Sequence, residues 1–303
     1  MNSIQYYQVA GHIFRLQLPT ESPLWKKLDN YAPFSIENPE NVEPIFTLQI
    51  TEAPTSYEPE TNKCIGEFDC DAAYLKLFET TDGGRMFFIS QGNKEKAYHL
   101  YTTTDYRSAS LYFPADGNES LHIFAINNAM MLLYAFATAT RNTLLIHASV
   151  IVNARKGYVF LGRSGTGKST HSRLWLNHVA GSALLNDDNP VIRIIGKTAY
   201  VYGSPWSGKT PCYKNEEASL GGIVRLSQAP RNEITHLKGV TAYAAITPSV
   251  SAMRWERQMA DGIHATLAAL TACTDIYHLE CLPDKAAACL CSDTVRKERT
   301  CNA

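Results

Sequence analysis

The sequence lacks several features that would each have indicated a particular class of protein. Its 303 residues carry a formal net charge of only −1, whereas a main partner of nucleic acid or anionic membrane usually requires a strong basic excess. Its eight cysteines include no Cys-x-x-Cys, and no Cys/His cluster has the spacing of zinc ligands. These absences argue against a nucleic-acid partner, a membrane partner and a zinc site, and they favour reduced thiols in a cytoplasmic protein.

A signal-peptide pattern and an uninterrupted membrane-spanning run are also lacking. The first six residues show no basic region followed by an apolar core. The most apolar stretch, residues 121–140, contains His122, Asn127 and Asn128 and is rich in Ala and Thr. We therefore predict a buried or amphipathic helix there rather than a membrane span.

The first 118 residues have a composition and alternation typical of β-strands. Turn signals separate the runs, which have no catalytic motif and suggest a meandering antiparallel sheet with a short helix at residues 22–30. The predicted strands cover residues 6–18, 44–51, 73–78, 85–90, 97–102 and 108–113. The break at residues 114–118 indicates two domains, a mainly β domain at 1–118 and a second domain at 119–303.

The second part alternates strand and helix patterns, which predicts an α/β fold with a mixed sheet. After the helix at 121–140, strands are predicted at 144–152, 158–161, 183–185, 191–195, 199–202, 223–226 and 275–280. Helices are predicted at 168–179, 258–272 and 284–295.

Residues 162–169 match the phosphate-binding pattern G-x-x-x-x-G-K-[ST] at every fixed position, between a strand pattern and a helix pattern. The glycines let backbone N–H groups turn inward, Lys168 offers a charge to the β- and γ-phosphates, and the Ser169 hydroxyl can bind Mg²⁺. A chance match is on the order of 1%, so an ordinary glycine-rich turn is disfavoured. We predict a site for ATP or another nucleoside triphosphate, formed by Gly162, Arg163, Ser164, Gly165, Thr166, Gly167, Lys168, Ser169 and Thr170.

Two acidic residues, Asp187 and Asp188, end an apolar run that follows this loop by one helix. A right-handed crossover would bring their strand back parallel to residues 158–161, and ligands lie beyond the carboxyl ends of such strands. One carboxylate could hold Mg²⁺ and the other could accept a proton from an attacking hydroxyl. The alternative is an acidic turn before Asn189 and Pro190, which the position after the loop makes less favoured.

A histidine, His147, is brought towards the same loop if residues 153–157 form a turn between two strands. Pairing of Val152 with Tyr158 would place His147 opposite Arg163. It would then contact phosphate or orient an aspartate, and the equal alternative is a hydrogen-bonded core histidine. Arg163 itself contacts phosphate or projects into solvent.

A later loop, residues 203–209, follows a strand and contains Trp206 and Lys209. It offers a mobile backbone, a stacking surface and a cation, and could close over the nucleotide or the acceptor. A surface turn is an equally good interpretation. We regard Trp206 and Lys209 as tentative substrate-binding residues.

The spacing of His147, the loop at 162–169 and Asp187–Asp188 resembles the catalytic domain of HPr kinase/phosphorylase, whose type of nucleotide core phosphoenolpyruvate carboxykinases share. Residues 203–208 and 221–226 resemble the broader group of HPr-kinase-related proteins, which includes kinases that modify a serine or the C-terminus of small peptides. The resemblance covers about residues 140–295 and does not extend to residues 1–118.

The resemblance implies roles for individual residues. Asp188 would be the base towards a hydroxyl, Asp187 would lie near Mg²⁺ with Ser169, and Lys168 and His147 would complete the catalytic site. It also implies a tendency to form homo-oligomers. The chain has no later Arg-Gly-rich signature loop, so neither HPr as acceptor nor phosphorylase activity is implied.

Three functions are consistent with this pattern. The favoured one is a Mg²⁺- and ATP-dependent kinase acting on a serine of a peptide or protein. A metabolite kinase acting on a small alcohol differs only in its acceptor. The third is a nucleotide-binding regulatory module without phosphoryl transfer, against which the presence of both aspartates and His147 argues.

Overall fold

The structure, a computed structural model, describes residues 1–51, 63–70, 73–92, 97–114, 117–208, 210–252 and 256–297. Its contacts divide the chain into two compact units, Met1–Thr138 and Ala139–Ala303. Helix α1 (Glu119–Thr138) therefore belongs to the N-terminal unit, whereas the sequence prediction ended the first domain at residue 118. The helix packs onto the sheet of that unit, since the Tyr134 hydroxyl donates to the carbonyl of Val9 at 3.0 Å.

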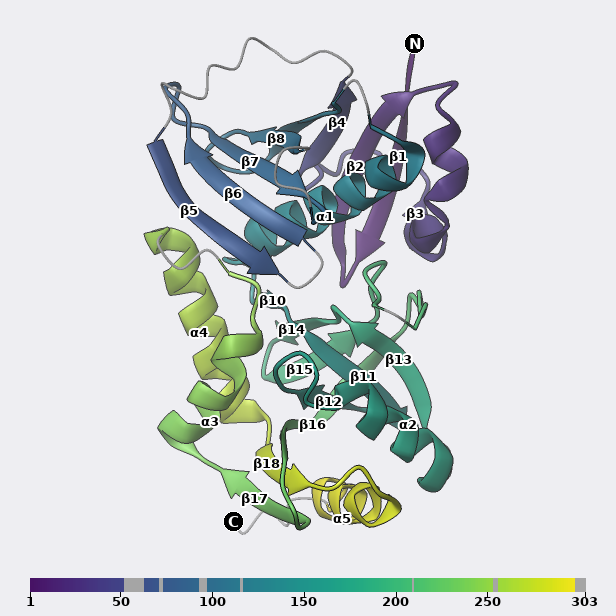
Figure 1. The fold of residues 1–303 in the computed structure, drawn as a ribbon, viewed down its shortest axis with the longest axis vertical. Coiled ribbons are helices and arrows are strands. Elements are labelled where there is room, and N and C mark those ends of the chain that lie inside the picture. The colour runs from purple at the N-terminus through teal and green to yellow at the C-terminus, as the bar shows by residue number, and fades with distance from the viewer. Residues whose placement is uncertain are drawn as a thin grey trace. The chain divides into compact units, whose positions relative to one another are not determined.

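The N-terminal unit contains a nine-stranded sheet among its described residues, in the order β3-β1-β2-β4-β9-β8-β7-β6-β5 (Figure 1). Its strands are β1 (Asn2–Val9), β2 (His12–Pro19), β3 (Ser35–Ile36), β4 (Thr47–Thr51), β5 (Lys63–Cys70), β6 (Ala73–Glu79), β7 (Arg85–Ser90), β8 (Tyr98–Thr102) and β9 (Ser108–Tyr112). Two 3₁₀ helices, η1 (Pro23–Lys27) and η2 (Asp29–Phe34), connect β2 to β3.

The mainly β character of this unit agrees with the sequence prediction, but two details differ. The single strand predicted at residues 6–18 is a hairpin, because Ala10 and Gly11 take φ values of 48° and 74° and turn the chain. Strand β4 is parallel to both its neighbours, β2 and β9, so the sheet is mixed rather than purely antiparallel. Parallel neighbours require long connections, which η1 and η2 provide between β2 and β4.

An aromatic core joins α1 to this sheet. The Phe14 ring lies 5.1 Å from Phe46 and 5.8 Å from Tyr134, measured between centroids. Among the described residues, one helix, α1, is long enough and apolar enough to cross a membrane. Half of its most apolar 18-residue window is buried in the structure. The core helix of a globular unit meets the same criteria of length and apolar composition. In this structure α1 packs as such a core helix.

The C-terminal unit is built on a second nine-stranded mixed sheet among the described residues. Its strands are β10 (Thr143–Leu145), β11 (Ala148–Asn153), β12 (Lys156–Leu161), β13 (Ala183–Asp188), β14 (Val191–Ile195), β15 (Thr198–Tyr202), β16 (Glu217–Gln228), β17 (Glu233–Leu237) and β18 (Ile276–Cys281). Its helices are α2 (Lys168–His178), α3 (Gly239–Ile246), η4 (Thr247–Ser249), α4 (Arg257–Cys273) and α5 (Lys285–Val295).

The strand order in this sheet is β10-β14-β15-β16-β12-β11-β13, with β18 also paired to β16 and β17 to β18. Strands β12, β16 and β18 are parallel neighbours, so their carboxyl ends share one edge. Strand β11 lies between β12 and β13 and is antiparallel to both. Strand β13 is therefore parallel to β12, as predicted, with one strand between them.

Four elements of this unit differ from the sequence prediction. The strand predicted at 144–152 is interrupted at Ile146 and His147 and forms two strands. The first, β10, pairs with β14, and the second, β11, pairs with β12. Strand β13 continues to Asp188 instead of ending at residue 185. Strand β17 and helix α3 were not predicted, since β17 is a largely exposed edge strand with little apolar alternation.

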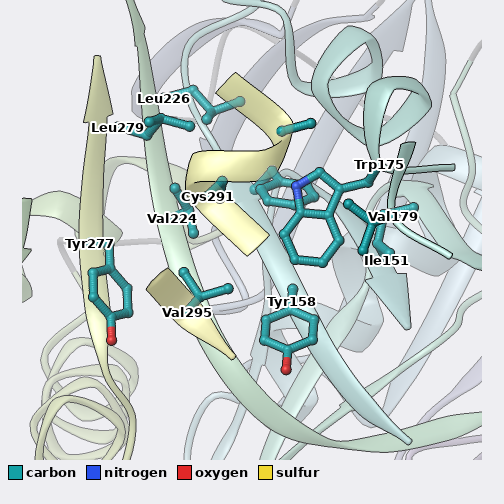
Figure 2. Close-up of a cluster of buried hydrophobic side chains, with 12 residues drawn as sticks. Ile151, Tyr158, Trp175, Val179, Val224, Leu226, Tyr277, Leu279, Cys291 and Val295 are labelled. Atoms are coloured by element: carbon teal, nitrogen blue, oxygen red, sulfur yellow. The ribbon is translucent and has the colours of Figure 1, made fainter. Parts of the chain in front are cut away.

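Helices α2 and α5 bury an apolar cluster against one face of the sheet (Figure 2). Trp175 of α2 is fully buried, and its ring centroid lies 5.2 Å from that of Tyr158 and 5.5 Å from that of Phe160. Figure 2 shows its indole next to Ile151 and Val179. This packing fixes α2, and with it the loop that precedes it, on strands β11 and β12.

Replacing Trp175 with Ala should lower the free energy of unfolding by about 3–5 kcal/mol, because the change removes a large buried ring and leaves a cavity. Urea unfolding followed by circular dichroism measures the change. Leu176→Ala on the same helix is the matched control, since Leu176 is 40% exposed. Equal losses in the two variants would contradict the assignment of Trp175 to the core.

Candidate functional site

A tight loop joins the end of β12 to the start of α2. Both the backbone nitrogen and the hydroxyl of Thr166 donate to the carbonyl of Arg163, at 3.1 and 2.6 Å. Gly165 and Gly167 have φ values of 77° and 108°, a backbone region that favours glycine. The loop therefore leads into the first turn of α2, whose N–H groups have no carbonyl partner within the helix itself, the geometry that binds anions at a helix N-terminus.

The polar side chains of the loop differ in how far they are exposed. The Lys168 ammonium is half-buried and donates to the carbonyl of Gly162 at 3.0 Å, so it lies over the loop. Arg163, Ser164, Ser169 and Thr170 are exposed. The exposed Arg163 is consistent with both alternatives that the sequence left open, contact with phosphate and projection into solvent.

The first residue of the aspartate pair lies beside the start of α2. The Ser169 hydroxyl donates to Asp187 Oδ1 at 3.0 Å. Asp187 pairs with Ser149 across β11 and β13, and the Ser149 hydroxyl hydrogen-bonds that of Ser172 at 2.6 Å. Strands β11 and β13 are therefore each joined to α2 by a side-chain hydrogen bond, between Ser149 and Ser172 and between Asp187 and Ser169.

The second aspartate contacts the histidine. His147 Nδ1 lies 3.3 Å from Asp188 Oδ1, and both side chains are partly exposed. The other carboxylate oxygen of Asp188 accepts from the Asn189 amide at 2.8 Å. His147 thus contacts an aspartate, and its role in orienting that aspartate stays a prediction.

The predicted hairpin register was wrong by one residue. Val152 pairs with Gly157 rather than Tyr158, so His147 falls opposite Gly162 and not Arg163 if the register is extended. The cause is the turn, in which Ala154 and Arg155 have φ values of 48° and 63°. A two-residue turn of this kind is tighter than the five-residue turn predicted.

A buried asparagine network holds the end of β13. The Asn186 amide donates to the Ser204 hydroxyl at 3.2 Å, and that hydroxyl donates to the carbonyl of Asn189 at 2.6 Å. Asn186 and Ser204 are both fully buried. These residues position the aspartates and were not identified from the sequence, although a polar residue inside the apolar run before Asp187 was the available signal.

The loop after β15 is the other support of this strand. Gly208 N–H donates to the carbonyl of Asp187 at 2.8 Å, and Ser207 forms a bridge with Asp188. Trp206 is only 4% exposed, so its indole is not the open stacking surface that the sequence suggested, because it packs inward. Lys209, the other tentative substrate residue, lies outside the described residues.

Hard oxygen ligands are present for the magnesium ion that the sequence predicts. No group of three or more His, Cys, Asp or Glu side chains able to hold a metal occurs in the described part of the chain. One carboxylate with one hydroxyl, as at Asp187 and Ser169, nevertheless fits Mg²⁺, which commonly takes its remaining ligands from substrate phosphates and water.

The C-terminal unit is thus a mixed α/β fold with a glycine-rich strand–loop–helix and two carboxylates at one edge of its sheet. No protein-family model matches the chain, and no curated protein sequence matches it. Among solved structures, the chain is similar to an HPr(Ser) kinase/phosphatase from Coxiella burnetii, at 11% identity and a TM-score of 0.30. The match covers 50% of this chain and 93% of that one, and it indicates a distant structural relationship only.

The buried histidine of α2 makes stability depend on pH. Trp175 Nε1 donates to His171 Nε2 at 3.2 Å, and burial lowers the pKa of His171 to about 4. The unfolded chain binds this proton near pH 6.5 and the folded one near pH 4, so stability falls as pH drops through that interval. Urea unfolding should show a loss of about 3 kcal/mol from this group. His171→Gln keeps a hydrogen-bond acceptor for Trp175 but has no titrating group. The variant should therefore lose this part of the dependence of unfolding free energy on pH. The same dependence in variant and wild type would contradict the lowered pKa of His171.

The loop after β15 should not tolerate a side chain at Gly203. A Cβ there would lie 1.9 Å from the carbonyl oxygen of Lys214, a backbone atom. Gly203→Ala should lower the free energy of unfolding by about 2 kcal/mol or more through overpacking, and displace the loop from Asp187. Thermal unfolding measures this, with Gly222→Ala as control, since the nearest atom to its Cβ would be 3.6 Å away. Similar melting temperatures for both variants would refute the close contact.

Proposed function

We propose that this protein is a kinase that transfers the γ-phosphoryl group of a Mg²⁺-bound nucleoside triphosphate, ATP by preference, to a hydroxyl group. The observation that carries the proposal is the 3.0 Å contact between the Ser169 hydroxyl and Asp187 at the end of a glycine-rich loop. A second carboxylate, Asp188, follows directly on the same strand. Phosphoryl transfer needs chiefly positioning and charge neutralisation, and these residues supply both.

The phosphates would bind to the backbone of residues 162–170, where the first turn of α2 offers N–H groups. Lys168 would exchange its hydrogen bond to Gly162 for the β- and γ-phosphates. Ser169 and Asp187 would hold Mg²⁺, which neutralises phosphate charge when bound. In this arrangement the γ-phosphate lies on the side of the loop that faces β13.

Asp188 would act as the base towards the acceptor. It takes the proton of the acceptor hydroxyl as that oxygen bonds to the γ-phosphorus, and the bond to the leaving nucleoside diphosphate breaks. Only one of its oxygens accepts from Asn189, and the 3.3 Å contact with His147 orients the other. Asp188 is 33% exposed, which leaves it accessible to an acceptor.

The finer identity of the enzyme is also proposed. The order of His147, the loop and the aspartates supports membership of the HPr-kinase-related group, in the cytoplasm, with a serine of a peptide or protein or a small alcohol as acceptor. Homo-oligomer formation belongs to the same proposal. The second candidate is a nucleotide-binding regulatory module, and the solvent-accessible Asp188–His147 pair favours the kinase over it, since a binding module needs no base.

Changing Asp188 to Asn should abolish transfer while nucleotide binding persists, because the amide keeps the size of the side chain but cannot take a proton. We expect the rate of phosphoryl transfer to fall by about 10²–10⁴-fold and the affinity for ATP to change by less than about threefold. The assay follows γ-labelled ATP with serine-containing peptides, free serine, small polyols and water as acceptors.

Asp261→Asn is the matched control, since Asp261 is an exposed residue of α4 that pairs with Arg257 at 3.8 Å. Full transfer by the Asp188 variant would remove that residue from the catalytic role. Tight ATP binding without any labelled product in the wild-type protein would favour the regulatory module.

A further inference from the structure

Four polar residues at the carboxyl ends of β16 and β18 are not used by the proposed transfer site. They are Arg225, Ser227 and Gln228 of β16 and His278 of β18. Val224 and Leu226, and likewise Tyr277 and Leu279, belong to the buried cluster of Figure 2. Because side chains alternate along a strand, Arg225, Ser227 and His278 point to the opposite face of the sheet, whereas Gln228, the last residue of β16, has the orientation of Leu226.

This group lies next to the phosphate loop. Arg225 pairs with Leu161, the last residue of β12, and also with His278. The Gln228 amide donates to the carbonyl of Gly165 within the loop at 3.3 Å. The carboxyl end of β16 therefore contacts the loop directly, and β18 lies about 10 Å from β12 at the usual strand spacing.

The topology gives a bound triphosphate a direction. Strand β12 has β11 on one side and β16 on the other. The Ser169–Asp187 contact sets the metal, and so the β- and γ-phosphates, towards β11 and β13. With the metal on that side, the opposite end of the ligand would extend towards β16 and β18.

The chemistry of the group suits a nucleoside. The Ser227 hydroxyl and His278 Nε2 are 2.8 Å apart, and this contact holds the imidazole ring of β18 next to β16. Arg225 is exposed, and no ion-pair partner for it occurs in the described ranges of the chain. A planar guanidinium and an imidazole can both stack on a base.

We infer that Arg225, Ser227 and His278 form the subsite for the nucleoside end of the bound triphosphate, and that Gln228 joins the end of β16 to the phosphate loop. The inference rests on the proposed function for the position of the phosphates. It gives β16 and β18 a binding role, while β11 and β13 carry the transfer chemistry.

The test compares two probes, ATP and inorganic tripolyphosphate, each with Mg²⁺, by titration calorimetry. His278→Ala and Arg225→Gln should each weaken ATP binding by about tenfold, whereas the affinity for tripolyphosphate should change by less than about twofold. Lys168→Ala should weaken both ligands, because its ammonium contacts phosphate. The controls are His178→Ala and Arg173→Gln, two exposed residues of α2 with the same changes in side chain.

The outcomes separate the inference from the function on which it rests. Unchanged ATP binding in both subsite variants, or equal weakening of ATP and tripolyphosphate, overturns the subsite while leaving the phosphate loop intact. A wild-type protein that binds neither probe overturns the proposed function itself. Arg225 is exposed, so Arg225→Gln should fold normally. That variant therefore tests the subsite even if His278→Ala lowers the melting temperature.

Discussion

The pairing of β11 with both β12 and β13 is the constraint on which the site depends. Ala148 lies opposite Leu161 on one side and opposite Asp188 on the other. Leu161 is the last residue before the glycine-rich loop, so this one level of the sheet sets the distance between phosphate loop and aspartate. Had β13 paired directly with β12, the carboxylates would lie one strand nearer to the loop and His147 would have no place beside them.

Packing on the two sides of β13 keeps that arrangement rigid. On one side, Trp175 and the Ser149–Ser172 hydrogen bond hold α2 against the strands, which aligns Ser169 with Asp187. On the other, the buried Asn186–Ser204 network and the backbone of Gly208 hold the strand end. Buried polar networks of this kind are costly unless fully paired, so they restrict the strand to one position. The acidic side chains are thereby held in one arrangement, which the phosphoryl transfer that we propose would require.

In our proposal, the two sides of the sheet bind different parts of the ligand. Its β11–β13 side carries carboxylates, a histidine and a hydroxyl, which suit metal, γ-phosphate and acceptor. Its β16–β18 side carries an arginine and a Ser–His pair, which suit a nucleoside. The glycine-rich loop lies between the two groups, and Gln228 bonds directly to it. The chain reaches this layout only because parallel strands β12, β16 and β18 end at one edge.

The sequence by itself determined the loop motif, the neighbouring helix and the identity of the two aspartates, because these are local patterns whose chemistry depends on spacing along the chain. It also separated a mainly β region from an α/β region. Only the tertiary structure decided that α1 belongs with the first unit, that β11 lies between β12 and β13, and that His147 contacts Asp188. The burial of Trp206 could not be predicted from the sequence either, since exposure depends on what packs over a residue. Strand order, register and burial are set by contacts between distant segments, and such contacts leave no local signal in one sequence.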